Sequence, residues 1–536
     1  MTQQDTHDTY YKVTEQKLAE MQELLERQPA SATELHRFAE ELREKLEVAH
    51  MQLSQPNVRR ACRINQWGRF LWNVLLLPAL AIYLVSRAFR ALSRSRQRLR
   101  RVRFRVGEWL RLYQNSRRRQ LEKKRPGITY PQGFEEAWAL KEKFKPLKST
   151  LVPNPDGKMR MNIVVPCLDP DLVFGGYISL LHLVRRLVRA GHHVRFIVGE
   201  QADLSHRKLL RDWSHRADLH DMFAKCEVLN LQRFLGGPVP VHPGDRFIAY
   251  SGWMAMWAHQ LAMQTPFKRF VFFIQEHEPV FHHNGSIRAA LESSYLLPHL
   301  PIFNTQTLHD HFQQEGFGIY DRSYPEADRP TPLVFEHAIA DLTPPTPEQL
   351  DARPVRKLLF YARPEGHAAR NLFALALMGL CEAVEHGYFP GRWEFHGIGT
   401  LAQKYTIDVG KGHRLKIIPR VPQEEYEAYI QNFDVGISLM MAPHPSILPF
   451  EMLSAGMVVV TNEYKHRDAE YYEKISRNIV PCLTTPMGIA EALKIAAEKA
   501  VDTPARLANA TVEWNRSWDS AFSPEFIARL VEELTV

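Results

Sequence analysis

Two regions of alternating strand and helix patterns constrain the fold of this chain more than any other feature. Short apolar runs alternate with amphipathic helix patterns from residue 155 to 340, and again from 357 to about 500. Such alternation is typical of a doubly wound parallel sheet. We therefore expect the α/β class with two Rossmann-like domains. The strand candidates are Met161–Val165, Val194–Val198, Arg246–Tyr250, Phe270–Ile274, Pro301–Asn304 and Lys357–Tyr361.

Shifts in composition divide the chain further. The polar, proline-rich stretch 341–348 predicts a hinge between the two α/β regions. The C-terminal end has the pattern of an amphipathic helix, which we expect to pack across both domains. The expected units are a helical extension at 1–58, a basic segment at 59–125, a linker at 126–154, an N-terminal domain at 155–340, a hinge linker at 341–356, a C-terminal domain at 357–512 and the final helix at 513–536.

The extension at 1–58 has the pattern of a helical pair. Ser31-Ala-Thr-Glu34 fits a capping box, and apolar residues then recur at spacings of three and four from Leu35 to Leu53. This stripe needs a partner helix, either within the extension or in a second copy of the chain. Self-association through a coiled-coil-like contact is therefore a hypothesis.

The basic segment at 59–125 concentrates the charge of the chain. It carries 20 Lys and Arg against two acids, a local charge of +18, so the remaining residues sum to −10. Its uncharged stretch Phe70–Val85 has 16 residues, fewer than the roughly 20 that a membrane-spanning helix needs. A hairpin lying on or re-entering an anionic membrane surface is favoured, because Trp67 and Trp72 suit headgroup depth. A buried helical hairpin and a nucleic-acid surface are the alternatives.

A loop and short helix near the C-terminal end predict a nucleotide site. Pro443-His-Pro-Ser446 opens a helix that carries Glu451 and stops at Gly456, before a wholly apolar strand. In an open α/β sheet such a loop lies where nucleotides bind. The first amides of the helix suit phosphate oxygens, and the carboxylate suits ribose hydroxyls. The alternative is a buried helix end that happens to carry a glutamate.

A second loop predicts a diphosphate clamp. The strand Lys357–Tyr361 is followed by Ala362–Asn371 and then by an apolar helix pattern from Leu372 to Gly387. Arg363 and Arg370 flank this loop, and a guanidinium can donate to two phosphate oxygens at once. Ordinary surface ion pairs are the alternative for each arginine.

These segments resemble a known family. The stretch from Tyr361-Ala-Arg363 to Arg370-Asn371, together with the stretch from Pro443 to Glu451, resembles the donor half of two-domain (GT-B fold) glycosyltransferases. It is similar in particular to family-four rhamnosyltransferases, which build bacterial O-antigen and S-layer glycans from dTDP-rhamnose. Val173–Gly176 and Phe272–Glu278 resemble parts of the acceptor half.

The resemblance implies a hexosyltransferase that retains the anomeric configuration, needs no metal and uses a nucleotide sugar. Relatives carry two glutamates eight positions apart, and the first of them falls on Pro443 here. Contact with the donor sugar is therefore expected from His444 or Ser446. The donor-binding residues that the resemblance implies are Gly175, Gly176, Arg363, Arg370, Asn371, His444, Ser446, Ile447, Leu448 and Glu451.

The end of the strand Phe270–Ile274 carries the candidate catalytic groups. We expect Gln275, Glu276, His277 and Glu278 to face the cleft between the domains, where a carboxylate or imidazole could accept the proton of the acceptor hydroxyl or orient that hydroxyl. The alternative for Glu278 is a structural cap or pair. A metal site from His277, His282 and His283 is disfavoured, because their spacing suits no standard zinc set.

The cysteine pattern and the polar N-terminal residues indicate the cellular compartment. The five cysteines are scattered without a Cys-x-x-Cys pair, and the first 30 residues are polar. Both features favour a reducing cytosol over secretion. We expect a glycosyltransferase that moves rhamnose onto a lipid-linked bacterial polysaccharide at the inner face of the cell membrane, with no nucleic-acid partner. A non-catalytic, membrane-tethered scaffold with a degenerate GT-B fold is the alternative. A phosphorylase or epimerase on the same fold is disfavoured, because neither a cofactor-lysine loop nor a histidine–acid constellation is evident.

Overall fold

The computed structural model describes residues 134–153, 157–170, 175–201, 203–232, 238–400, 404–419, 421 and 423–535. The helical extension expected at 1–58 and the basic segment expected at 59–125 lie outside these residues, as do residues 126–133 and 154 of the expected linker. The described part contains two seven-stranded sheets, here called the N-terminal and C-terminal lobes, and a small two-stranded sheet of β1 (Ser149–Leu151) and β5 (Val239–Val241).

The N-terminal lobe is built on a parallel sheet in the order β4-β3-β2-β6-β7-β8-β9. The central strands are almost continuously apolar because helices cover both faces. The chain runs outward in one direction from β2 and then restarts beside it at β6, which places the topological switch point between these two strands. The strands are β2 (Arg160–Val165), β3 (His193–Val198), β4 (Glu227–Asn230), β6 (Asp245–Ala249), β7 (Phe270–Ile274), β8 (His299–Asn304) and β9 (Leu333–Phe335).

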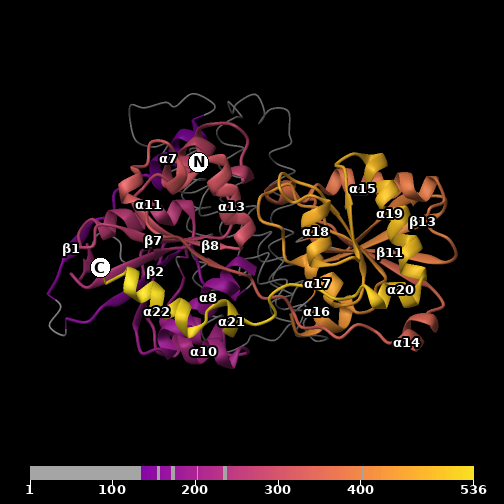
Figure 1. Cartoon of the computed structure of the whole chain (residues 1–536). Helices are drawn as coiled ribbons and strands as arrows, with labels where there is room; N and C mark the ends of the chain where they lie inside the picture. The colour runs from indigo at the N-terminus through magenta and orange to yellow at the C-terminus, as the bar shows by residue number, and fades with distance from the viewer. Residues whose placement is uncertain are drawn as a thin grey trace, which may run out of the picture. The chain divides into compact units, whose positions relative to one another are not determined.

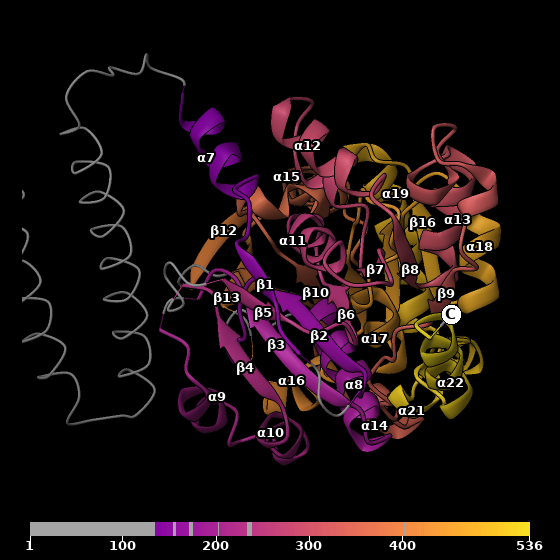
Figure 2. The same cartoon turned by 90° about the vertical axis from the view of Figure 1, so that its left-hand side faces the viewer.

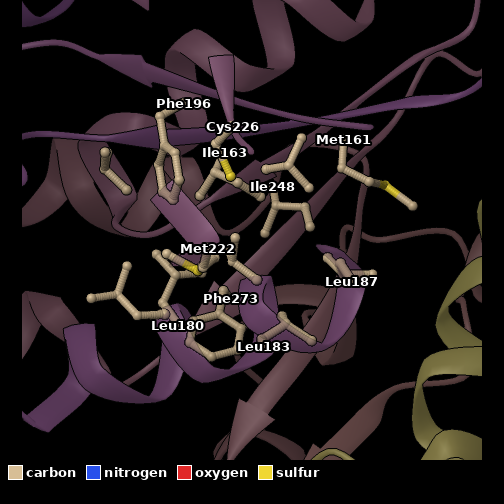
Figure 3. Close-up of a cluster of buried hydrophobic side chains, with 14 of the residues drawn as sticks. Met161, Ile163, Leu180, Leu183, Leu187, Phe196, Met222, Cys226, Ile248 and Phe273 are labelled. Atoms are coloured by element: carbon tan, nitrogen blue, oxygen red, sulfur yellow. The ribbon is translucent and has the colours of Figure 1, made fainter. Parts of the chain in front are cut away.

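Alternate residues of these strands supply two separate cores. Met161, Ile163 and Phe273 point to one face, where α8 and α10 cover them, and Figure 3 shows this cluster. Phe270 and Phe272 point to the other face, which α11, α12 and α13 cover. Figures 1 and 2 show the two layers of helices. The helices of this lobe are α7 (Glu135–Lys143), α8 (Gly175–Arg189), α9 (His206–Asp212), α10 (Ala217–Ala224), α11 (Gly252–Ala262), α12 (Ser286–Ser294) and α13 (Gln306–Glu315).

The C-terminal lobe has the strand order β12-β13-β11-β10-β14-β15-β16. All neighbours are parallel except the hairpin β12–β13, and the switch point lies between β10 and β14. Its strands are β10 (Arg356–Tyr361), β11 (Trp393–Thr400), β12 (Tyr405–Gly410), β13 (His413–Pro419), β14 (Val435–Ile437), β15 (Val458–Asn462) and β16 (Ile479–Cys482). Its helices are α14 (Pro347–Asp351), α15 (Phe373–Glu385), α16 (Gln423–Ile430), α17 (Leu448–Ser454), α18 (Ala469–Ile475), α19 (Pro486–Val501) and α20 (Thr503–Ala508).

The C-terminal segment returns to the N-terminal lobe. The helices α21 (Trp518–Ala521) and α22 (Pro524–Glu533), yellow in Figure 1, lie beside α8 and β2. Phe522, Ile527, Leu530 and Leu534 are buried in the same core as α8. Two arginines of the lobe donate hydrogen bonds to the last carbonyls of this segment, one of them from Arg246 Nε to Leu534 O at 2.6 Å.

The six strand candidates coincide with β2, β3, β6, β7, β8 and β10, with ends shifted by two residues at most. Within the described ranges, no helix is long and apolar enough to cross a bilayer.

Candidate active site

The carboxyl-terminal ends of the two sheets meet. A short helix, η3 (Glu278–Phe281), follows β7, and another, η6 (Gly366–Asn371), follows β10. The guanidinium carbon of Arg370 lies 4.3 Å from the centroid of the Phe281 ring. The backbone N–H of His444 donates to Glu276 Oε1 at 3.2 Å. Groups from the carboxyl-terminal edges of both sheets therefore form a single site, the lobe junction.

Glu276 lies at the centre of the lobe junction. Its Oε1 also accepts from the backbone N–H of His277 at 2.9 Å, and its side chain is 6% exposed. Burial raises the pKa of Glu276, while the nearby charges of Arg370 and Arg467 and the two backbone N–H donors oppose that shift. The N-terminal lobe thus presents a buried carboxylate to the C-terminal lobe.

His277 and Glu278 lie in surroundings different from those of Glu276. Glu278 Oε2 accepts from the backbone N–H of Gly252 at 3.0 Å and so caps α11. Burial raises its pKa to about 7. The ring of His277 packs 4.3 Å from that of Phe317, and burial lowers its pKa to about 3. The chain turns into η3 directly after β7, so successive side chains point in different directions.

The two arginines of the expected clamp lie at the switch point of the C-terminal sheet. Arg363 follows β10, where its Nη1 donates to the Tyr361 hydroxyl at 3.1 Å and its Nε to Glu365 at 3.3 Å. Arg370 lies at the end of η6, beneath Phe281 and within electrostatic reach of Glu276. Burial lowers the pKa of Arg370, and the Glu276 carboxylate opposes that shift. Both guanidiniums therefore lie at the carboxyl-terminal edge of the C-terminal sheet.

The side chain of Asn371 donates a hydrogen bond to the backbone of the segment after β14. Its Nδ2 donates to Leu439 O at 3.3 Å and lies 3.6 Å from the sulfur of Met440. The backbone N–H of Met441 donates to Arg370 O at 2.7 Å. These contacts tie η6 to the segment after β14, so the amide of Asn371 holds the loops together across the switch point.

The loop 443–448 carries the other predicted donor contacts. His444 is 7% exposed, and its Nδ1 accepts from the backbone N–H of Ser446 at 3.1 Å. Burial lowers the pKa of His444 well below its ordinary value, so the ring is neutral with its proton on Nε2. Ser446 has a φ of 65°, an uncommon left-handed conformation for a residue with a side chain. Ile447 is the N-cap of α17 without a side-chain cap, and Leu448 is its first residue.

Glu451 lies one turn into α17. Its Oε2 accepts from the hydroxyl of Tyr426, on α16, at 2.9 Å. Burial raises the pKa of Glu451 to about 7, which the Tyr426 hydrogen bond opposes. The carboxylate is thus oriented by a hydrogen bond from a neighbouring helix.

The glycine pair opens α8. A Cβ at Gly176 would lie 2.8 Å from the Tyr250 hydroxyl and 3.0 Å from Gln275 Oε1, so a larger residue would displace these side chains. A Cβ at Gly175 would meet His337 at an ordinary 3.7 Å. The close approach at Gly176 brings the start of α8 against the end of β7.

Arg467 is a residue of this site that sequence reasoning missed. Its side chain is wholly buried, and its Nη2 donates to Met440 O at 2.7 Å and to Ala442 O at 2.9 Å. Its Nη1 donates to the hydroxyl of Tyr472 at 2.6 Å. Arg467 belongs to no motif, and its only sequence signal is its place shortly after β15, at the sheet edge that carries the site.

Across the described residues, no group of three or more His, Cys, Asp or Glu is arranged to hold an ion.

Comparisons with known proteins match both lobes. Residues 160–306 match the family model described as WsaF, N-terminal domain, and residues 356–494 match WsaF, C-terminal domain. The O-antigen biosynthesis protein RfbC of Myxococcus xanthus is 29% identical over 199 residues, which make up 36% of this chain and 14% of that protein. The chain therefore spans about one seventh of the length of this relative.

Several solved structures are similar at low identity. Sucrose-phosphate synthase from Thermosynechococcus elongatus is 12% identical with a TM-score of 0.44, and the match covers 70% of this chain and 98% of that one. TarM is 8% identical with a TM-score of 0.48, over 70% of this chain and 99% of that one. The fold is assigned from the two sheets themselves, because these scores are low.

Proposed function

Because the chain belongs to the WsaF family of GT-B glycosyltransferases, we propose that it transfers a sugar from a nucleotide-sugar donor to a bacterial surface polysaccharide. We propose dTDP-rhamnose as the donor, since WsaF is an S-layer rhamnosyltransferase. The printed name of the Myxococcus relative, an O-antigen biosynthesis protein, supports a surface-glycan product. This family membership confirms the resemblance drawn from the motifs.

The placement of Arg363 and Arg370 carries this proposal. Both guanidiniums lie at the carboxyl-terminal edge of the C-terminal sheet, and Arg370 also contacts the facing lobe through Phe281. Nucleotides bind at such switch points in open α/β sheets. A nucleoside diphosphate held there would place its sugar between the lobes, beside Glu276 and His444.

The role proposed for each side chain depends on where charge develops during the transfer of the sugar. As the sugar leaves the nucleotide, negative charge grows on the diphosphate, and preorganised guanidiniums stabilise it. In this proposal Glu451 accepts hydrogen bonds from the ribose hydroxyls. Glu276 orients or deprotonates the acceptor hydroxyl, for which it must be ionised. The family is a retaining one, and we propose retention here.

Nucleotide binding tests this function. We expect dTDP-rhamnose and dTDP to raise the melting temperature of the wild-type protein. Arg363→Ala should weaken dTDP binding by about 10- to 100-fold, because a charge-assisted hydrogen bond contributes about 1.5–3 kcal/mol. Thymidine, which lacks the diphosphate, should bind both proteins equally. Arg477→Ala, at an exposed arginine in the same lobe, is the matched control.

Two outcomes contradict the proposal. Equal weakening of dTDP and thymidine binding would exclude a diphosphate clamp at Arg363. If no nucleotide sugar stabilises the wild-type protein, the non-catalytic scaffold is the better account.

The acceptor and the membrane contact are also proposals. A lipid-linked glycan acceptor would bring the enzyme to the inner face of the cell membrane. The basic segment 59–125, with 20 Lys and Arg, suits that anionic surface.

A further inference from the structure

We infer that the lobe junction contains a subsite for two hydroxyl groups of a saccharide, formed by Gln275, Glu276, Asn304 and His444. The identity of the sugar in the subsite rests on the proposed function, whereas the subsite itself rests on the contacts described below. Each of the four side chains has one buried polar atom that finds no hydrogen-bond partner among the described residues. These atoms are Gln275 Nε2, Glu276 Oε2, Asn304 Oδ1 and His444 Nε2.

The first pair of atoms comes from the ends of β7 and β8. Gln275 Oε1 accepts from Asn304 Nδ2 at 2.9 Å and lies 3.0 Å from the hydroxyl oxygen of Ser179. Asn304 Nδ2 also lies 3.4 Å from His337 Nδ1. These contacts fix the orientation of both amides. Gln275 therefore keeps a donor, Nε2–H, and Asn304 keeps an acceptor, Oδ1.

The second pair comes from the two lobes. His444 Nδ1 is occupied as an acceptor by the backbone N–H of Ser446, so the neutral ring keeps a donor at Nε2–H. Glu276 Oε1 accepts from two backbone N–H groups, which leaves Oε2 as an acceptor. The hydrogen bond from His444 N to Glu276 Oε1 places these two residues side by side across the junction.

The two pairs are neighbours. Gln275 and Glu276 are consecutive, and the pairing of Ile274 with Phe303 puts Asn304 beside Gln275. His337 lies beside the first pair, with its Nδ1 within 3.4 Å of Asn304 Nδ2. The four side chains therefore belong to neighbouring residues at the lobe junction.

The chemistry of this region matches hydroxyl groups. A hydroxyl donates one hydrogen bond and accepts others, so one donor and one acceptor together satisfy it. Buried polar groups without partners are rare in folded proteins, and four in one region require a physical reason. A phosphate fits poorly, because the Glu276 carboxylate would repel it. A sugar ring with two hydroxyls fits both pairs, whether it belongs to the donor or to the acceptor glycan.

Isosteric apolar variants test the subsite. We would measure the affinities of dTDP, dTDP-rhamnose and a rhamnosyl oligosaccharide for the wild type, Gln275→Met and Asn304→Leu, with Glu276→Gln for the second pair. At least a tenfold loss is expected for one sugar-bearing ligand, with dTDP affinity unchanged within twofold. A loss confined to dTDP-rhamnose assigns the subsite to the donor sugar, and a loss confined to the oligosaccharide assigns it to the acceptor.

Asn478→Leu is the matched control. Asn478 is also a buried amide with an unpartnered Oδ1, but its Nδ2 donates to Arg506 O, on α20. It should lower the melting temperature as Asn304→Leu does and leave all three affinities unchanged.

The outcomes separate this inference from the proposed function. If the wild type binds dTDP but the variants keep wild-type affinity for both sugar-bearing ligands, the subsite is overturned and the proposed function stands. If the wild type fails to bind dTDP but binds the oligosaccharide in a manner that depends on Asn304, the subsite stands and the proposed function fails. A wild type that binds no sugar-bearing ligand more tightly than its bare nucleotide overturns the subsite.

Discussion

At the scale of single residues, Arg467 combines a structural and an electrostatic effect. Its guanidinium donates to the carbonyls of Met440 and Ala442, which lie four and two residues before His444. Its charge also opposes the rise in the pKa of Glu276 that burial causes. The same buried guanidinium therefore supports the conformation of the loop before His444 and lowers the pKa of Glu276.

Replacing Arg467 should therefore change the pH dependence of the reaction. Arg467→Met should destabilise the fold by about 3 kcal/mol, because it leaves buried carbonyls without donors. It should also lower kcat/KM and move the acid limb of the pH profile to higher pH, since the pKa of Glu276 rises without the positive charge. Steady-state kinetics from pH 5 to 9 measure this shift.

Arg506→Met is the matched control. Arg506 is equally buried in the same lobe but donates to Asp434, on the side of the sheet away from the site. This variant should lose comparable stability and keep the wild-type profile. An unchanged acid limb in Arg467→Met would show that Arg467 only supports the loop.

At the scale of elements, α22 joins the end of the chain to the N-terminal core. Its buried face carries Ile527 and Leu530, which lie in the same cluster as the residues of α8 and β2. Exposed residues such as Arg529 occupy the opposite face. The helix is therefore part of the N-terminal lobe although it follows the C-terminal lobe in sequence.

Truncating this face should destabilise the protein. Leu530→Ala is expected to lower the free energy of unfolding by about 2–5 kcal/mol, because it removes a wholly buried side chain and leaves a cavity. Arg529→Ala, on the exposed face, should change it by less than about 0.5 kcal/mol. Urea denaturation of both variants checks this, and equal effects would mean that α22 does not pack as described.

At the scale of the whole molecule, buried imidazoles set the response to acid. Each keeps a low pKa in the folded state because burial disfavours its charged form. Below pH 6.5 the unfolded chain binds protons that these rings exclude, so the folded state loses stability as pH falls. Glu278, Glu336 and Glu451 act in the opposite sense, since burial raises their pKa values to about 7. The imidazoles, with pKa values of about 3 or 4, are His182, His277, His299, His311 and His337.

His299, which lies far from the lobe junction, can be used to measure the effect of a single buried imidazole on the pH dependence of stability. His299 lies in the core of the N-terminal lobe against Phe270 and Phe272, and burial lowers its pKa to about 4. His299→Phe should flatten the fall in unfolding free energy between pH 6 and 4.5 by about 1.4 kcal/mol per pH unit. Urea denaturation across this range measures the slope. His283→Gln, at an exposed position, serves as the control, and equal slopes in wild type and His299→Phe would refute the account.

The membrane proposal also belongs to this scale. Removing residues 59–125 should release the protein from vesicles that contain phosphatidylserine, because this segment carries a local charge of +18. Vesicles of phosphatidylcholine alone control for contacts that do not depend on charge. Sedimentation with anionic vesicles that persists after the deletion would exclude the segment as the anchor.

The sequence by itself determined the α/β class, the two sheets and the sheet edge that carries the site. Apolar strand runs and helical spacing are local signals, so they identified β2, β3, β6, β7, β8 and β10 to within two residues. The short strand β14 and the edge strand β4 carry too few apolar residues to be recognised, and pairing with neighbours defines them instead.

Only the tertiary structure decided which side chains share the lobe junction. Glu276, His277 and Glu278 are equivalent in the sequence, yet one faces the other lobe, one packs among aromatic rings and one caps α11. Asn304, at the end of β8, and Arg467, in the segment after β15, belong to the site without being part of any motif. The physical reason is that burial and hydrogen bonding depend on contacts between residues far apart in the chain, which no local pattern records.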